Sequence, residues 1–337
     1  MEKENPHEIP MVSICCLTYN HEKYVKQALD GFLMQKTNFP FEIVIHDDAS
    51  TDNTANIIRE YADKHPDVFK PLLQTENQRS KFGGGMNPRF NFPRAKGKYI
   101  AICEGDDYWT DPYKLQKQVD FLENNQEYVL CFHEVKILKP DGELVADYIT
   151  KVPENYQTQE DFARYGNYIH APSVLFKNVI ETFPESFWKT PVGDFFIYML
   201  VTNYGKMIKL NDVMSVYRAG SGVWSTQSAY PKNFRTAYAH ALIIESMEEN
   251  KKVVQALLGR IRLFLLRFYE NITVDDLKKL TTTPEVQQVV YESLQEIIQE
   301  KDRLLEKEKE NHIDNVATKH LITKLFKQVK KKIWKSR

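Results

Sequence analysis

Residues 42–58 read EIVIHDDASTDNTANII, an apolar run that passes through acidic and hydroxyl side chains into a helical pattern. The run Phe41–His46 predicts a buried strand, and the segment from about Asp52 to His65 predicts the helix that follows it. The same alternation fills the first 140 residues. Further strands are predicted at Met11–Leu17, Val68–Gln74, Lys98–Cys103 and Tyr128–Leu138, and further helices at Glu22–Met34 and Asp111–Asn124.

Continuous apolar strands separated by helices are typical of a mostly parallel sheet that is covered on both faces. We therefore expect an α/β fold with a mostly parallel, Rossmann-like sheet flanked by helices. Ligands bind such sheets beyond the carboxyl ends of the strands. In this chain, clusters of acidic residues fall at that edge.

The remainder of the chain is predicted to be mixed at first and then helical. Short strands are expected at Ser173–Phe176, Met207–Lys209 and Met214–Tyr217, and helices at Asp194–Tyr204, Ala237–Met247, Val253–Tyr269 and Glu285–Lys309. The segment Thr281–Pro284 is a predicted helix break. We expect three parts: an α/β domain in residues 1–225, a helical region in 226–312 and a basic tail in 313–337.

Acidic residues directly follow two of the predicted parallel strands. Asp48 follows the strand Phe41–His46, and the segment Glu104–Asp107 follows the strand Lys98–Cys103. Carboxylates gathered at one edge repel each other unless a cation or hydrogen-bond donors compensate them. Mn²⁺ and Mg²⁺ prefer one or two carboxylates plus substrate phosphates. We expect such a metal here, with Gly105 small enough to let a ligand approach the backbone.

Helix capping is the structural alternative for some of these acids. Asp52 and Asp111 each precede a predicted helix, where a carboxylate accepts backbone hydrogen bonds. We interpret Asp111 as a cap and Asp52 as partly one. For Asp48 and Asp106, which stand on different strands but at the same expected edge, we favour a functional role.

Composition narrows the classes of function. The net charge is −1, so the chain as a whole gives no electrostatic reason to expect nucleic acid as a partner. The four cysteines, at positions 15, 16, 103 and 131, lie in apolar runs and are expected to be buried thiols. The polar start Met1–Pro10 does not resemble a signal peptide, and no apolar run reaches membrane-spanning length. We expect a cytoplasmic protein.

Three motifs in chain order resemble a known enzyme family. Val12–Leu29 (VSICCLTYNHEKYVKQAL), Glu42–Ile58 and Ala95–Asp107 (AKGKYIAICEGDD) resemble segments of the family-two glycosyltransferases with a GT-A fold, and the resemblance covers roughly residues 11–220. It implies a glycosyltransferase that moves a sugar from a nucleotide-sugar donor to a hydroxyl acceptor. UDP is the usual nucleotide of this family, and dTDP and GDP stay open.

The resemblance implies roles for the donor-site residues. Thr18, Tyr19 and Asn20 match the loop that lines the nucleotide base and ribose. Asp48 matches the carboxylate that reads the edge of the base. The segment Asn77–Asn87, with three consecutive glycines, lacks the spacing of a phosphate-binding P-loop and is expected to be a flexible loop beside the donor.

The segment Glu104–Asp106 stands where the family has its Asp-x-Asp motif. The resemblance makes Asp106 the contact of the divalent metal, Mn²⁺ or Mg²⁺, and of the donor diphosphate. Glu104 replaces the first Asp and can reach the ribose or a metal-bound water. Arg218, in a late segment that resembles the loop over the diphosphate, either supplies positive charge to the donor or pairs with a surface carboxylate.

Asp194 is the expected catalytic base. Pro191–Leu200 (PVGDFFIYML) resembles the family's acidic motif beneath the acceptor, although Gly193 stands where a Glu is more typical. The structural alternative for Asp194 is a helix N-cap, and we favour the base. By the same resemblance His170 lies near the acceptor, and we interpret it as a hydrogen-bonded core histidine.

These roles imply a single displacement with inversion at the anomeric carbon, because no second carboxylate is identified as a nucleophile. Two competing functions are a non-catalytic nucleotide-sugar-binding module with the same fold and a nucleotidyltransferase. The latter usually carries a Gly-rich loop with a basic residue after the first strand, where this chain has Thr18 to His21.

The last 25 residues predict a basic amphipathic helix. From Ile313 to Arg337 there are eight Lys or Arg and one Asp, and the apolar residues of Leu321–Trp334 follow one helical face. We expect this tail to attach the protein to an anionic membrane surface, the inner face of the membrane, where a saccharide or lipid-linked saccharide acceptor of surface polysaccharide synthesis is found. The alternative is a helix packed on its own domain or on a partner.

Overall fold

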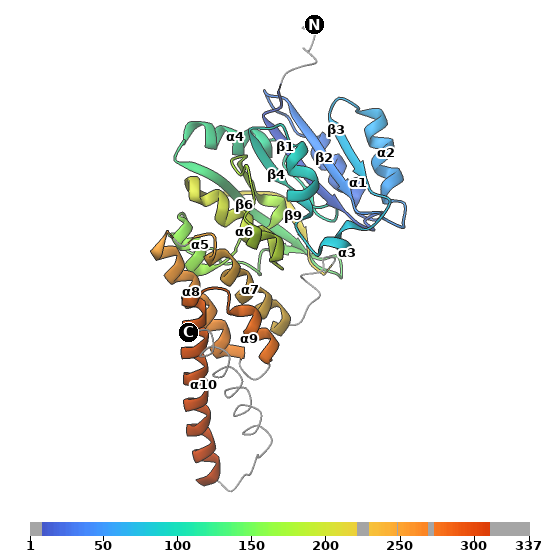
Figure 1. Cartoon of the computed structure of the whole chain (residues 1–337). Coiled ribbons are helices and arrows are strands. Elements are labelled where there is room, and N and C mark those ends of the chain that lie inside the picture. Colours follow the sequence, from blue (N-terminus) through green and yellow to red (C-terminus); the bar gives the residue numbers. More distant parts are fainter. Residues whose placement is uncertain (1–8, 221–228, 248, 269–272, 311–337) are drawn as a thin grey trace. The chain divides into compact units, whose positions relative to one another are not determined.

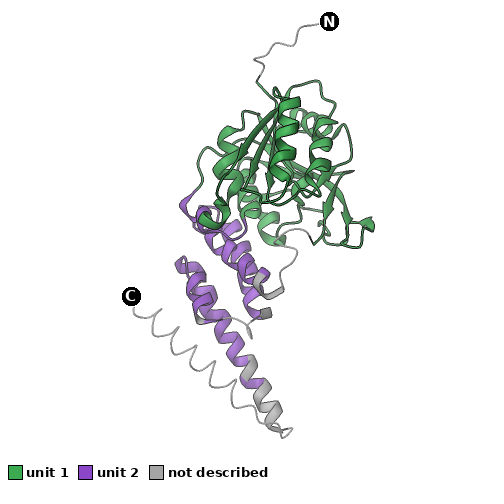
Figure 2. Ribbon diagram, turned by 90° about the vertical axis from the view of Figure 1, so that its right-hand side faces the viewer, with its two compact units in different colours: residues 1–183, 193–226 green, residues 184–192, 227–337 purple. Residues whose placement is uncertain are grey.

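The computed structural model describes residues 9–220, 229–247, 249–268 and 273–310 (Figure 1). The chain forms two compact units (Figure 2). Unit 1 comprises Met1–Phe183 and Gly193–Thr226, and unit 2 comprises Pro184–Val192 and Gln227–Arg337.

Within its described residues, unit 1 is built around a nine-stranded sheet. The order is β3-β2-β1-β4-β8-β6-β9-β5, with β7 paired to β6. The strands are β1 (Val12–Thr18), β2 (Phe41–Asp47), β3 (Phe69–Leu73), β4 (Tyr99–Ile102), β5 (Tyr108–Trp109), β6 (Tyr128–Leu138), β7 (Leu144–Ala146), β8 (Leu175–Lys177) and β9 (Lys206–Arg218).

The parallel half of this sheet confirms the predicted fold class. β1 pairs in parallel with β2 on one side and β4 on the other, and β2 pairs in parallel with β3. β1 and β4 are almost completely buried, which explains why their sequences are apolar without alternation. Their carboxyl ends and that of β2 meet at one edge, where Thr18 lies opposite Asp47. All four cysteines are buried free thiols, as expected.

Helices flank the sheet of unit 1. α2 packs on α1 and β3, and α4 packs on β6. The helices of this unit are α1 (Val25–Leu33), α2 (Thr54–Lys64), α3 (Gln78–Phe82), α4 (Lys114–Asn124), α5 (Gln159–Tyr165) and α6 (Gly193–Val201), with short η1 (Asn87–Asn91), η2 (Phe92–Arg94), η3 (Ala171–Ser173) and η5 (Thr202–Tyr204).

Two predictions about local structure are wrong for identifiable reasons. The two short strands expected near Met207 and Met214 form one strand, β9. Its pairing with β6 moves from Leu210 to Val213 within a single step, so Asn211 and Asp212 form a bulge whose polar side chains interrupt the apolar pattern. Asp111 does not cap α4, which begins three residues later.

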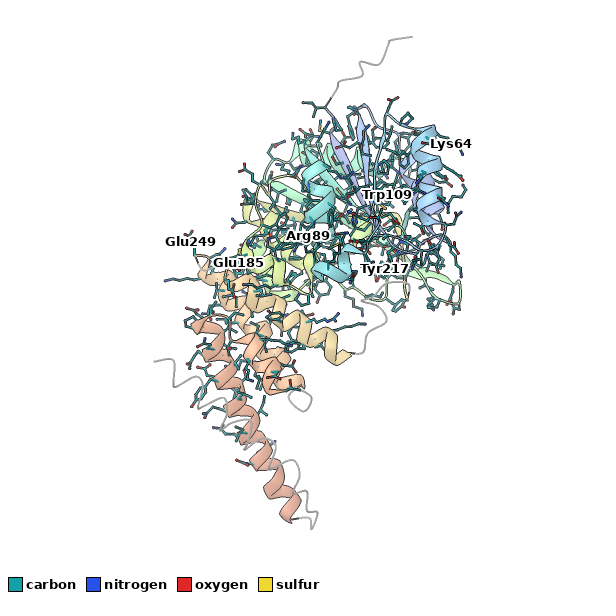
Figure 3. All side chains as sticks on the ribbon, turned by 45° about the vertical axis from the view of Figure 1, so that its right-hand side comes forward. Lys64, Arg89, Trp109, Glu185, Tyr217 and Glu249 are labelled. Carbon is teal, nitrogen blue, oxygen red and sulfur yellow. The ribbon has the colours of Figure 1, made fainter. Side chains whose placement is uncertain are left out.

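A lysine is buried beneath the sheet edge, in the first turn of α4. The side chain of Lys114 is 0% exposed, and its Nζ donates to Gln118 Oε1 at 2.7 Å and lies 4.2 Å from the centre of the Trp109 ring. Burial lowers the pKa of Lys114 to about 7. Trp109, labelled in Figure 3, also packs edge-to-face on Phe32. Lys114 therefore lies in the core of unit 1, between Gln118 and Trp109.

Unit 2 is helical in its described part. Its elements are η4 (Glu185–Lys189), α7 (Ala229–Ile244), α8 (Lys251–Phe268), α9 (Val274–Leu280) and α10 (Pro284–Glu310). The predicted break at Thr281–Pro284 is confirmed, because α9 ends and α10 begins there. Helix α9 was not predicted, although the Thr273–Asp276 capping box marks its start in the sequence.

Within the ranges given above, no helix combines the length and the apolar character needed to cross a bilayer. The predicted amphipathic tail, residues 313–337, lies outside the described residues.

Candidate functional site

The loops that follow β1 and β2 are joined by polar side chains. Thr18 donates its hydroxyl to Asp47 at 2.8 Å, and Asn20 accepts the N–H of Thr51 at 2.8 Å. Asp52 accepts the N–H groups of Glu22 and Thr54, each at 3.0 Å, but the N-cap position of α2 is occupied by Asn53, so the expected capping role of Asp52 reduces to the bond with the first residue of the helix. The Thr18 hydroxyl is thus hydrogen-bonded to another side chain of the protein. The side chain of Tyr19 takes part in none of these contacts and is 45% exposed.

Two left-handed residues mark these loops. Asn20 has φ of 55° and Ala49 has φ of 61°. Asparagine tolerates this conformation, but alanine adopts it at a cost of about 1 kcal/mol or more, so the surrounding contacts hold it in place. Ala49 directly follows Asp48, and strain at that position is typical of loops that hold a functional side chain in a set direction.

Asp48 holds the start of α3. Its carboxylate accepts the backbone N–H groups of Gln78 at 2.6 Å and Arg79 at 3.0 Å, and its carbonyl accepts the side chain of Asn77 at 3.0 Å. The prediction of a flexible loop over residues 77–87 is therefore wrong for its first part. Asn77 caps α3 by accepting the N–H of Ser80 at 2.8 Å, a cap pattern that the sequence contains. A nucleotide base would have to share the Asp48 carboxylate with α3.

The loop after β4 packs directly on the loop after β1. The N–H of Gly105 donates to the Leu17 carbonyl at 2.9 Å. A Cβ at Gly105 would lie 2.6 Å from Thr18 Cγ2 and 3.0 Å from His21 Nδ1. The glycine is therefore favoured by the close packing between two protein loops.

Glu104 lies among the predicted acids. Its side chain is exposed, and the surrounding protein followed by the charges of Asp106 and Asp194 raises the pKa of Glu104 to about 7. The positive charge of Arg79 acts in the opposite direction. The acids that follow β4 and the acid at the start of α6 are thus close enough to influence each other.

Arg218 braces the same loop from the end of β9. Its backbone N–H donates to Asp107 Oδ1 at 2.7 Å, and its Nε donates to the Asp106 carbonyl at 2.8 Å. The guanidinium lies 4.4 Å from the centre of the Tyr24 ring. Burial followed by the charge of Asp106 raises the pKa of Asp107 well above its usual range, against the bond from Arg218. Asp107 therefore fixes the loop, a role that sequence analysis missed.

Asp194 occupies the first turn of α6. Its Oδ1 accepts the N–H of Phe195 at 2.7 Å, and its Oδ2 accepts the side-chain amide of Asn167 at 3.0 Å. The surrounding protein raises the pKa of the Asp194 carboxyl, and these hydrogen bonds partly offset the effect. A Cβ at Gly193 meets nothing within 4 Å, so packing does not require the glycine that replaces the typical Glu.

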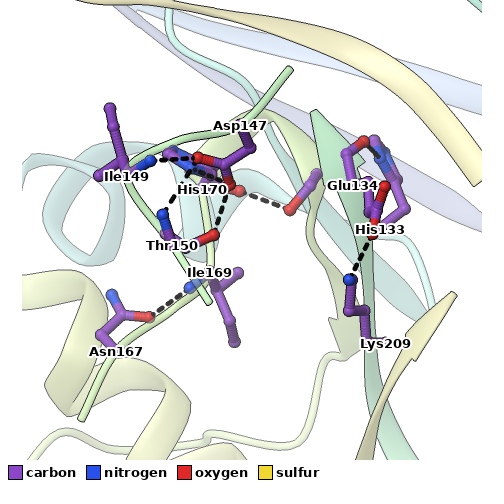
Figure 4. Close-up of polar contacts among 10 residues, drawn as sticks. His133, Glu134, Asp147, Ile149, Thr150, Asn167, Ile169, His170 and Lys209 are labelled. Carbon is purple, nitrogen blue, oxygen red and sulfur yellow. Dashed lines mark hydrogen bonds and ion pairs between the residues drawn. The ribbon is translucent and has the colours of Figure 1, made fainter. Parts of the chain in front are cut away.

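His170, three residues after Asn167, forms a polar network with Asp147. Its Nε2 lies 3.0 Å from Asp147 Oδ2 (Figure 4), and its ring centre lies 4.7 Å from that of Tyr217. Asp147 also accepts the N–H groups of Ile149 at 2.8 Å and Thr150 at 3.1 Å. The interpretation of His170 as a hydrogen-bonded histidine is confirmed. Burial followed by the charges of Asp107 and other site acids raises the pKa of Tyr217, which links the network to the site.

The acids that follow β4 could bind a metal ion only if a bound substrate supplied the remaining metal ligands. Across the described part of the chain, no three His, Cys, Asp or Glu side chains gather closely enough to hold a metal ion by themselves. The repulsion of Glu104 by Asp106 and Asp194 is nevertheless what a cation would relieve. The residues therefore fit a metal that takes one or two carboxylates here and its other ligands from donor phosphates.

Tyr198, one helical turn after Asp194, provides a test of the packing below the site. It is 0% exposed, and its hydroxyl has no hydrogen-bond partner among the described residues. A buried hydroxyl without a partner costs about 1–3 kcal/mol. We expect Tyr198→Phe to keep the melting temperature or raise it by a few degrees.

Tyr156 is the matched control for this substitution. It is also buried, but its hydroxyl donates to the Gly166 carbonyl and accepts the N–H of Tyr168 at 3.3 Å. Tyr156→Phe should lower the melting temperature, as measured by differential scanning calorimetry. Equal losses in the two variants would mean that the Tyr198 hydroxyl has a partner.

Comparison with known proteins agrees with this geometry. The family described as Glycosyl transferase family 2 matches residues 13–183. An uncharacterised protein of Mycobacterium tuberculosis is 33% identical over 266 residues, which are 76% of this chain and 74% of the relative. TuaG of Bacillus subtilis, a putative teichuronic acid biosynthesis glycosyltransferase, is 31% identical over 133 residues, which are 40% of this chain and 50% of the relative.

Solved structures share the fold. Residues 1–349 of S. aureus TarS in complex with UDP superpose with a TM-score of 0.58 at 16% identity, over 91% of this chain and 94% of that chain. The same protein in complex with UDP-GlcNAc gives a TM-score of 0.55 at 20% identity, over 86% of this chain and 80% of that chain. At this identity the likeness concerns the fold, which is GT-A-like as expected.

Proposed function

Because the chain belongs to glycosyl transferase family 2, we propose that it transfers a sugar from a UDP-sugar to a hydroxyl group of a saccharide acceptor. Family membership makes the chain a glycosyltransferase that uses a nucleotide-sugar donor, and a nucleotidyltransferase is thereby ruled out. The observation that carries the finer proposal is that Glu104, in the loop after β4, lies near enough to Asp194, at the start of α6, to be affected by its charge as well as by that of Asp106. It joins a donor-side acid to an acid suited to act on the acceptor. We assign this activity to residues 1–225.

The donor side supports UDP as the nucleotide. TarS, which shares the fold, has been solved with UDP and with UDP-GlcNAc. In this chain the corresponding edge offers the exposed ring of Tyr19 for stacking on a base, beside Asn20 and the Asp48 carboxylate. Arg79, whose charge reaches Glu104, is positioned on α3 to contribute positive charge near the diphosphate.

The acceptor side supports general-base catalysis by Asp194. A raised pKa makes a carboxylate a stronger base than an ordinary aspartate, which suits removal of a proton near neutral pH. The acceptor oxygen attacks the anomeric carbon as its proton passes to Asp194. The bond between that carbon and the diphosphate oxygen breaks, UDP leaves with the electron pair, and a single displacement inverts the configuration.

A divalent metal, Mn²⁺ or Mg²⁺, would supply charge that stabilises the departing diphosphate. Asp106 would hold it, with Glu104 beside it. Arg218 keeps the backbone of Asp106 in place, so this arginine acts on the donor site through the loop and not as a free cation.

The acceptor class is proposed from a relative. TuaG is named for teichuronic acid biosynthesis, which supports a saccharide acceptor and a role in surface polysaccharide assembly. A lipid-linked saccharide at an anionic membrane would suit the basic residues of 313–337.

The decisive test is titration calorimetry of UDP with the full chain, with and without Mn²⁺. We expect Mn²⁺ to tighten UDP binding and Asp106→Ala to weaken the metal-dependent binding at least tenfold, about 1.4 kcal/mol. Asp120→Ala is the matched control, because Asp120 is an exposed acid of α4 that pairs with Gln116. A UDP affinity that changes neither on addition of Mn²⁺ nor in Asp106→Ala would contradict the metal assignment. Binding of GDP or dTDP in place of UDP would contradict the nucleotide assignment.

A further inference from the structure

The carboxylate of Asp194 is held from a second element of unit 1. Asn167 lies in the segment between α5 and η3, and its Nδ2 donates to Asp194 Oδ2 at 3.0 Å. The other end of the same amide, Oδ1, accepts the N–H of Ile169 at 2.9 Å (Figure 4). An amide whose oxygen accepts a backbone N–H must present its NH₂ group to the carboxylate, so the direction of this contact is set by the network.

The backbone around Asn167 is fixed on both sides. Gly166 ends α5 with φ of 93°, in the left-handed region that favours glycine, and its carbonyl accepts the Tyr156 hydroxyl. The same hydroxyl accepts the N–H of Tyr168. Farther along, His170 is bound to Asp147. Asn167 therefore projects from a braced segment, and its amide has little freedom to follow a moving carboxylate.

The two hydrogen bonds to Asp194 divide its carboxylate. The N–H of Phe195 holds Oδ1 from within α6, and Asn167 holds Oδ2 from outside the helix. Two donors on different elements prevent rotation of the carboxylate about its Cβ–Cγ bond. The other titratable groups that influence this position are Glu104 after β4, Tyr198 on α6 and Tyr217 on β9. None of these three makes a hydrogen bond to the Asp194 carboxylate among the contacts that the structure describes.

We propose that Asn167 is a positioning residue for sugar transfer: its amide fixes the orientation of the Asp194 carboxylate and stabilises its ionised form. This inference rests on the proposed function, in which Asp194 accepts the proton of the acceptor hydroxyl. In that step the O–H bond breaks, the oxygen bonds to the anomeric carbon, and the proton stays on Asp194 while UDP departs. Asn167 neither gains nor loses a proton.

The test compares three forms at position 167 by the pH dependence of kcat. Asn167→Ala removes a hydrogen bond to a charged group, which should move the acidic limb of the profile upward by on the order of one pH unit. Asn167→Asp places a second carboxylate beside Asp194 and should move the limb further. We expect kcat at pH 7 to fall on the order of tenfold in the first variant and more in the second, with the KM of the donor unchanged. Raising the pH should recover part of the loss.

Asn178→Ala is the matched control. Asn178 is an exposed asparagine whose side chain donates to the Gly97 carbonyl at 3.2 Å, at the opposite end of β4. It should change melting temperature without moving the pH limb. If kcat falls in the Asn167 variants but the acidic limb of the pH profile does not move, the proposal is overturned. Asn167 would then have only a structural role.

A fourth variant separates this inference from the function on which it rests. If Asp194→Asn is inactive while both Asn167 variants keep the wild-type profile, Asp194 acts without Asn167, and only the inference fails. If Asp194→Asn keeps full activity, the assignment of the base fails and the inference fails with it.

Discussion

Under the proposed function we expect Asp194→Asn to lower kcat for sugar transfer by roughly 10²–10⁴-fold, the usual contribution of a positioned general base. The amide has the shape of the carboxylate but cannot accept the acceptor's proton. It leaves the start of α6 intact, because its oxygen can still accept the N–H of Phe195. The KM of the donor should therefore stay within a few-fold of wild type, since Asp106 and the loops after β1 and β2 are unchanged. Initial rates at saturating donor and acceptor give the comparison.

Asp120→Asn is the matched control for this result. It makes the same exchange of a carboxylate for an amide on α4, where Asp120 is exposed and accepts a bond from Gln116. Its kcat should equal that of the wild type. A transfer rate in Asp194→Asn within threefold of wild type would show that another group accepts the proton.

The second large effect concerns the buried lysine of α4. Lys114 has a folded-state pKa of about 7 and an unfolded value near 10.5, because burial disfavours its charged form. Between these values the unfolded chain binds a proton that the folded chain lacks, so stability rises with pH. Below pH 7 both states are protonated and the full cost of the buried charge is present. Above about pH 10.5 neither is protonated, and the cost is gone.

Lys114→Met therefore stabilises the protein most at pH 7 and below, and its advantage shrinks by up to about 1.4 kcal/mol per pH unit as the pH rises. Methionine has a similar length and tolerates irregular surroundings. Urea unfolding of the full chain at pH 7, 8 and 9, with wild type and variant side by side, measures the difference. Titration of the cysteines and tyrosines is common to both chains and cancels.

Lys117→Met on the same helix provides the contrast. The side chain of Lys117 is partly exposed and pairs with Asp111 and Asp212, so its pKa is raised by these hydrogen bonds and it stays charged over this range. Its difference from wild type should not change between pH 7 and 9. A flat difference for Lys114→Met as well would mean that Lys114 is hydrated in the folded protein.

The sheet and the general place of the site could be predicted from sequence for a physical reason. A strand that is buried on both faces is apolar over most of its length. This pattern makes β1, β2 and β4 recognisable in the sequence. Polar residues at their ends can lie only at the carboxyl edge. Asp48, Glu104 and Asp106 were located by this rule. The order of strands β8, β6, β9 and β5, in contrast, depends on pairings between distant segments that leave no periodic signal.

The supporting contacts of the site could not be predicted in the same way. Asn167 donates to Asp194 across 27 residues, and Arg218 donates to the Asp106 carbonyl across 112. No local pattern distinguishes an asparagine that supports an acid from one on the surface. From the sequence, Asp107 was grouped with the other acids that follow β4. In the structure it accepts the backbone N–H of Arg218 and so supports the loop after β4.

The close packing of Gly105 on Thr18 and His21 has an evolutionary consequence. Because a methyl group at position 105 would meet the Thr18 methyl at 2.6 Å, the permitted residues at 105 depend on the residue at 18. The two positions are therefore epistatic, and relatives with a larger residue at one should carry a smaller residue at the other. A directed-evolution library for donor preference should therefore vary positions 18 and 105 together. Libraries that change one position at a time would not contain the compatible pairs of residues.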